Sequence, residues 1–170
     1  MRAGLETYAV KMRQPPHRSF FRNALARRAR PVGAGRDAVH EYLIDQANLR
    51  VFHGAYSDRS DLGARDPLLD LEDIVVGLLQ PHAPAEPRVL KLVVRILQSG
   101  SIDPARLLLL ARRERALGVL TWLVGLIPAE ERNDPIRDLE ERLRRNPPRD
   151  KRRPSIRYDP RRLVRRAGLG

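Results

Sequence analysis

The 170-residue sequence has no cysteine and few aromatic residues, which make up 5% of the chain. Without cysteine, disulfides and thiolate metal sites are excluded, and a reducing compartment such as the cytoplasm is favoured. Long hydrophobic runs are lacking as well. The longest, residues 116–127, has twelve residues, whereas a membrane-spanning helix needs about 20. We therefore expect a cytoplasmic protein with no membrane span.

Lysine is also scarce. Of the 33 basic residues only Lys11, Lys91 and Lys151 are lysines, and the formal net charge is +12. This charge is concentrated near the two ends, because residues 1–30 carry a net +7, residues 144–166 a net +9, and the chain between them a net −4. Basic arms on a nearly neutral body favour acidic partners, nucleic acid above all. A GC-rich genome would produce the same excess of arginine over lysine.

Four helices are predicted between residues 70 and 146. Each starts at an acidic residue that can cap it or at a proline suited to its first turn, and each ends before a proline or a glycine. In the first helix Asp70 is the expected cap, and Asp73 completes a short capping box. The loops are short, so we expect antiparallel packing. The predicted helices cover residues 71–80, 87–99, 104–127 and 135–146.

The distribution of apolar residues predicts where these helices lie. Residues 105–111 and 116–127 are apolar all round, so we expect both to be central. Gly118 interrupts this stretch, either because two helices approach closely there or because the helix breaks. The last helix has one narrow apolar stripe and several i,i+4 pairs of opposite charge, so it is expected on the surface.

Residues 38–56 fit two interpretations. They form either a β-hairpin near 42–53 around a DQAN turn, or a helix that starts at Asp37. In both cases the predicted fold is mainly α: a small antiparallel helical bundle flanked by basic irregular arms. The predicted organisation is a basic arm over 1–36, a mostly helical domain over 37–145 and a basic tail over 146–170.

The segment HGAYSDRSDLGARDPLLDLEDIVV (53–76) has a glycine and a small residue, followed by two carboxylates one residue apart, Asp70 and Glu72. This order resembles the way nucleotidyltransferase-fold proteins hold a metal-bound nucleotide. Ala55 stands where that family has serine, and the family's carboxylates lie on a strand at a shorter spacing. The alternative role for Asp70 is the helix cap.

A second resemblance covers residues 49–127, through LRVFHGAY, LLDLEDIVVGLL and SIDPARLLLLARRERALGVLTWL. This order of hydrophobic patterns resembles the helical part of abortive-infection-type nucleotidyltransferase and antitoxin proteins, downstream of their active site. The resemblance implies a helical accessory part from which the catalytic half is missing. It therefore assigns no catalytic residue.

Other catalytic motifs are not found. The four histidines (His17, His40, His53 and His82) show no metal-ligand spacing, although His40 or His53 could act as a lone base. GAGRDA at 33–38 lacks the preceding hydrophobic strand of a dinucleotide site, and no Walker loop or G-x-S-x-G elbow occurs. We expect no cofactor, no metal and no catalytic residue, which favours a non-enzymatic protein.

Thirteen residues are predicted to contact nucleic acid. Three of them, Arg88, Lys91 and Arg95, lie within about 60° of one another on the helix over 87–99. A solvated helix face is the simpler explanation for these three. The others belong to the tail, where arginines can fork onto phosphates and a tyrosine can stack on a base. A solubilising tail is the alternative. The thirteen are Arg88, Lys91, Arg95, Arg149, Lys151, Arg152, Arg153, Arg157, Tyr158, Arg161, Arg162, Arg165 and Arg166.

Three functional hypotheses follow from the sequence. The leading one is a non-enzymatic, nucleic-acid-associated regulator or antitoxin-like protein that binds the phosphate backbone of DNA or RNA through its basic arms. Its helical body would then supply a protein partner's contacts or form a homodimer. The first alternative is a helical protein-interaction domain with solubilising tails. The second is a divergent nucleotidyltransferase-like remnant, in which Asp70 and Glu72 would share a cleft.

Overall fold

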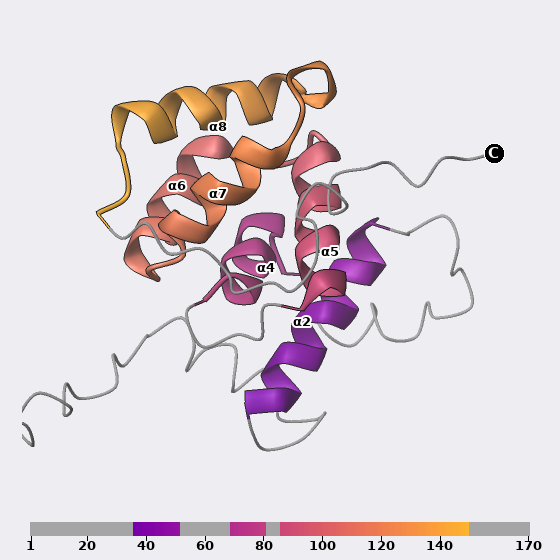
Figure 1. Cartoon of the computed structure of the whole chain (residues 1–170). Helices are drawn as coiled ribbons and strands as arrows, with labels where there is room; N and C mark the ends of the chain where they lie inside the picture. Colours follow the sequence, from indigo (N-terminus) through magenta and orange to yellow (C-terminus); the bar gives the residue numbers. More distant parts are fainter. Residues whose placement is uncertain (1–35, 52–68, 81–85, 150–170) are drawn as a thin grey trace, which may run out of the picture.

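The computed structural model describes residues 36–51, 69–80 and 86–149 (Figure 1). These residues form helices and a 3-10 turn, with no β-strand among them, so the predicted mainly α fold is confirmed for this part of the chain. The predicted arms lie almost wholly outside the described residues, and the limits of the predicted domain remain a prediction. The helices are α2 (Arg36–Val51), α4 (Leu71–Leu78), α5 (Pro87–Gln98), α6 (Pro104–Arg113), α7 (Leu117–Leu126) and α8 (Asp134–Arg145).

Helix α2 decides between the two interpretations of residues 38–56. Its sixteen residues are continuously helical, so the β-hairpin predicted near 42–53 is wrong for residues 42–51; residues 52 and 53 are outside the described ranges. Tyr42, Leu43 and Ala47 are buried on one side of α2. This i, i+4 spacing is a helical period, and it outweighs the β-propensity of the tyrosine and valine residues.

Helix α4 lies at the centre of the bundle. Figure 1 shows it between α2 and α5 on one side and the group formed by α6, α7 and α8 on the other. Its residues from Ile74 to Leu78 are all buried, and Ile74, Val75 and Val76 have no exposed surface. The short helix with a β-branched centre therefore supplies the middle of the core.

The prediction that residues 105–111 are central is wrong. Within α6 only Leu107 and Ala111 are buried, whereas Leu109 is 68% exposed. Leu108 and Leu110 are half-buried against the core, so α6 packs on α4, α7 and α8 and leaves the face with Leu109 to solvent. Helix α7 also exposes part of its surface, since Trp122 and Leu126 are only half-buried.

The predicted long helix over 104–127 is two helices. α6 ends at Arg113 and α7 begins at Leu117. The chain reverses at Arg115, the only described residue other than glycine with a positive φ, 60°. Gly118 is not the break, because it is buried inside α7.

Capping side chains fix the starts of α6 and α8. The cap of α6 is an aspartate, as predicted, and the cap of α8 is an asparagine that was not predicted. The side chain of Asp103 accepts hydrogen bonds from the backbone N–H groups of Ala105 and Arg106, as a helix cap does. At α8 the cap is Asn133, whose Oδ1 accepts from Ile136 N at 3.0 Å. The same Asn133 donates through Nδ2 to Leu97 O and Gln98 O, and so docks the start of α8 on the end of α5.

The opposite end of α8 meets the end of α6. Arg112, in the last turn of α6, donates from Nη2 to Asn146 Oδ1 at 3.0 Å. The two helices are therefore parallel. Helix α7, which follows α6 and precedes α8 in the sequence, runs in the opposite direction. Consecutive helices α6, α7 and α8 thus alternate in direction, as their short loops predict. None of the described helices is long and apolar enough to span a membrane.

Candidate nucleic-acid interface

The predicted basic row on α5 is on its exposed face. Arg88, Lys91 and Arg95 are exposed, while Val89 and Val93 on the same helix are buried. Arg88 is paired twice: its Nε lies 2.7 Å from Glu86 Oε2 and its Nη2 lies 3.5 Å from Glu41 Oε1 on α2. Much of the charge of Arg88 is thereby balanced within the bundle.

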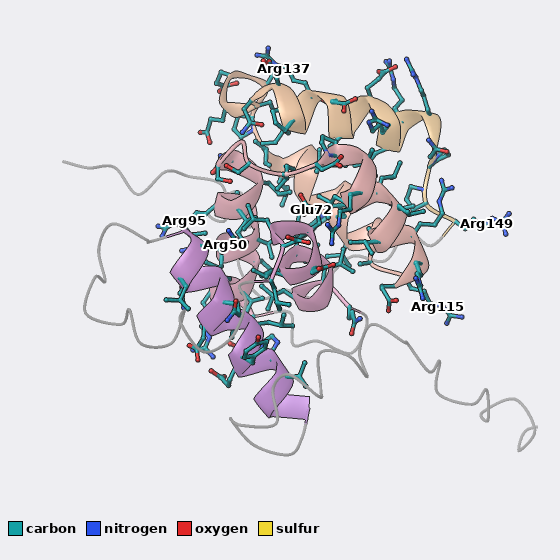
Figure 2. All side chains as sticks on the ribbon, turned by 180° about the vertical axis from the view of Figure 1, so that it is seen from behind. Arg50, Glu72, Arg95, Arg115, Arg137 and Arg149 are labelled. Atoms are coloured by element: carbon teal, nitrogen blue, oxygen red, sulfur yellow. The ribbon has the colours of Figure 1, made fainter. Side chains whose placement is uncertain are left out.

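The predicted tail residues can be placed only at their beginning. Arg149 is exposed and follows α8 at the edge of the molecule (Figure 2). The other nine predicted tail contacts, from Lys151 to Arg166, lie outside the described residues. Their role in binding remains a prediction based on the sequence.

The described part of the chain is electrically neutral. It contains fifteen basic and fifteen acidic residues, so the whole net charge of +12 belongs to the segments outside it. Of that charge, residues 1–35 carry +7 and residues 150–170 carry +6, and the remainder is −1. The helical body has no net attraction for a polyanion beyond its local arrangement of charges.

One local arrangement was not predicted from the sequence. The ends of α6 and α8 are joined by the contact of Arg112 with Asn146, and exposed arginines surround this contact. A helix C-terminus carries a partial negative charge that favours cations nearby. We call this group the arginine end; it consists of Arg112, Arg113, Arg115, Arg144, Arg145 and Arg149.

Half of the arginine end is paired with acidic side chains. Arg144 and Arg145 both form ion pairs with Glu141, and Arg113 Nε lies 3.9 Å from Glu114 Oε1. The other three form no ion pair with any carboxylate of the described residues; these are Arg112, Arg115 and Arg149. Their guanidinium groups are therefore available to an external anion.

The sequence contains the arginines of the arginine end, but their grouping cannot be predicted without the position of the helix break. The stretch ARRER (111–115) reads as the middle of a helix when 104–127 is taken as one element. Only the reversal at Arg115 places these arginines at a helix end. Only the parallel packing of α6 and α8 then brings them near Arg149, which is 34 residues from Arg115 in the sequence.

A cluster of opposite charges joins the starts of α4 and α6. Arg106 Nη2 lies 2.7 Å from Asp70 Oδ2 and 3.1 Å from Asp73 Oδ2. Glu72 is buried, and its Oε1 accepts a hydrogen bond from Asp103 N at 2.6 Å. Each of these acidic side chains thus has a partner on or just before α6.

The predicted capping roles of two residues in this cluster are corrected by these contacts. Asp70 precedes α4 in the position of a cap, but its side chain makes no capping hydrogen bond. Asp73 makes no capping box, because Arg106 holds it. The arginine competes successfully for both carboxylates, since a charged donor makes a stronger hydrogen bond than a neutral amide.

The electrostatics of the cluster follow from its partial burial. Burial raises the pKa of Asp73, Arg106 acts against this shift, and Asp70 adds to it. Burial alone would lower the pKa of Arg106, but the attraction of Asp73, Asp70 and Glu72 outweighs burial, and the pKa is raised. Arg106 therefore stays charged and ties the two helices together.

This cluster gives the nucleotidyltransferase-like alternative no support. Asp70 and Glu72 are occupied by different partners within the fold: the first pairs with Arg106, and the second accepts a hydrogen bond from the backbone N–H of Asp103. Within the described ranges no group of three histidine, aspartate or glutamate side chains is placed to hold a metal ion. Gly54 and Ala55, the other half of the resemblance, lie outside those ranges.

No protein-family model matches this chain. No curated protein and no solved structure matches it either.

Proposed function

We propose that this chain is a non-enzymatic nucleic-acid-binding protein, a regulator or antitoxin-like factor of the cytoplasm, which engages the phosphate backbone through its basic ends. The observation that carries the proposal is the separation of charge. A helical body with fifteen residues of each sign is joined to terminal segments with net charges of +7 and +6. Solubility alone does not require such a division, since the body already has a charged surface.

The expected mechanism is release of counterions from the nucleic acid. Each arginine or lysine that neutralises a phosphate displaces condensed cations, so the logarithm of the association constant falls linearly with the logarithm of salt concentration. Contacts of this kind carry no sequence information by themselves. The proposal therefore predicts binding that tolerates changes of sequence and weakens steeply with salt.

Deletion of residues 147–170 tests the proposal. The shortened chain keeps Asn146 and its contact with Arg112, so its helical circular dichroism should match that of the full chain. Its binding to a labelled DNA or RNA oligonucleotide should be lost. A second variant with glutamine in place of every basic residue over 151–166 controls for length. Undiminished binding by either variant would refute the proposal.

A helical protein-interaction domain is the second candidate, and one observation favours it. Leu109 is 68% exposed on α6, and Trp122 and Leu126 on α7 are half-buried. Under this alternative a protein partner covers part of these surfaces, and the arms serve solubility. A gel-shift titration across a salt series separates the two candidates, because the alternative predicts little nucleic-acid binding at any salt concentration.

A further inference from the structure

The turn between α6 and α7 is a Schellman motif with an arginine in the glycine position. The N–H of Ala116 bonds to Ala111 O at 2.8 Å, and the N–H of Arg115 points to Arg112 O at 3.4 Å. These are the two hydrogen bonds that define the motif. Arg115 occupies the residue after the cap, with φ at 60°, where glycine is strongly preferred because it has no Cβ.

The side chain of Arg115 has no acidic partner among the described residues that would offset this strain. It is exposed, and it forms no ion pair with any of the described carboxylates. A side chain held in a disfavoured backbone conformation points to a role outside the fold's own stability.

Two other arginines without an acidic partner share this end of the molecule. Within the described ranges Arg112 has no acidic partner and donates a hydrogen bond to the neutral amide of Asn146, and Arg149 follows Asn146 by three residues. Figure 2 shows Arg115 and Arg149 at the same end of the bundle, whereas Arg137 lies at the opposite end of α8. Three guanidinium groups are thus grouped where the chain enters its basic tail.

We infer that Arg112, Arg115 and Arg149 form a phosphate-binding site for the nucleic-acid backbone, which continues the contacts of the tail onto the helical body. The inference rests on the proposed function and deepens it by assigning body residues to the same polyanion. Arginine suits this task because its planar guanidinium can donate two hydrogen bonds to one phosphate. Arg115 is the residue on which the inference depends most, because a charged, exposed side chain stands at a position where glycine is preferred.

The substitution Arg115→Gly separates binding from stability. Glycine relieves the left-handed conformation, so the midpoint of urea denaturation should rise. The same change removes a phosphate contact, so the slope of log K against log salt should become less negative by about 0.9 on duplex DNA and about 0.7 on single-stranded RNA. On the duplex, the loss of affinity between about 50 and 200 mM salt should therefore be about threefold smaller than for the wild type. The probes are a fluorescein-labelled DNA duplex and a labelled single-stranded RNA.

Two variants control for charge and for backbone conformation. Arg137→Gln removes one exposed arginine, itself paired with Asp134 at 3.6 Å, from the far end of α8, and should leave the slope unchanged. Arg115→Lys keeps both the charge and the strained backbone, and should keep the slope without gaining stability. An effect of Arg137→Gln equal to that of Arg115→Gly would show a general charge effect and overturn the inference.

The outcomes distinguish this inference from the proposed function. If the full chain binds, tail deletion abolishes binding, and Arg115→Gly binds like the wild type, then the site is wrong and the proposed function stands. If the full chain binds neither probe at low salt, both are wrong. A loss of stability in Arg115→Gly would show that the arginine side chain supports the fold, and this would also overturn the inference.

Discussion

The buried carboxylate of Glu72 on α4 accepts a hydrogen bond from the backbone N–H of Asp103 at 2.6 Å. Asp103 in turn caps α6 through its own side chain. The two interactions form a chain from the central helix to the first turn of α6. These interactions fix the start of α6 against the core. They thereby help to set the orientation of α6 and the position of the arginines in its last turn.

Replacement of Glu72 tests this connection. Glu72→Ala removes the carboxylate that accepts from the part-buried N–H of Asp103, so the free energy of unfolding should fall by about 1.5–3 kcal/mol. Glu72→Gln keeps an acceptor oxygen in place, and its loss should be smaller, about 1 kcal/mol. Urea denaturation followed by circular dichroism measures both. Equal stability of Glu72→Ala and the wild type would contradict the assignment.

Asp103 and Asp70 provide a matched pair, because both are aspartates directly before a helix. Asp103→Ala removes two capping hydrogen bonds and should lower the free energy of unfolding by about 1 kcal/mol. Asp70→Ala removes only a half-exposed pair with Arg106 and should cost about 0.5 kcal/mol or less. If both losses were the same, the distinction drawn between a cap and an ion pair would be wrong.

The titration of Asp73 should be visible in the pH dependence of stability. Burial raises its pKa above the ordinary 3.8 in the folded state, so the folded protein holds this proton more tightly than the unfolded chain does. The stabilisation that results is full below that ordinary pKa and is lost as pH rises through the folded-state pKa. Asp73→Asn has no such titration.

The measurement is the difference in free energy of unfolding between Asp73→Asn and the wild type, from urea denaturation at several pH values. This difference should shift in favour of Asp73→Asn as pH rises from about 3 to about 7. Because both proteins share every other titrating group, the subtraction cancels the groups that do not interact with Asp73 and leaves the titration of Asp73 with its coupled neighbours. A difference that is constant, or that shifts in favour of the wild type, would contradict the raised pKa.

Local signals predicted the helices from residue 70 on, because prolines and polar caps act within a few residues. The start of α6 at Pro104, after the cap Asp103, and the end of α5 before Gly100, which has φ at 78°, are examples. The same local pattern failed at Asp70. There the outcome depends on Arg106, a residue from another helix that no local rule brings near.

Burial and charge clustering were harder to predict, because both depend on which face of each helix packs. The leucines over 107–110 gave no preferred face, and only the packing of α6 beside α4 and α8 decides that Leu107 is buried and Leu109 exposed. The arginine end likewise required the break at Arg115 and the parallel arrangement of α6 and α8. A single sequence contains no direct signal for either.

The salt dependence of nucleic-acid binding by the full chain tests the central claim most directly. A fluorescein-labelled DNA duplex and a labelled RNA strand are titrated with protein at several salt concentrations, and log K is plotted against log salt. If a neutral helical body engages phosphates through its basic ends, both plots are linear, and the slope on the duplex is more negative than about −4, one contact contributing about −0.9 on duplex DNA and about −0.7 on a single strand. A slope near zero, or no binding at the lowest salt concentration, would contradict the account.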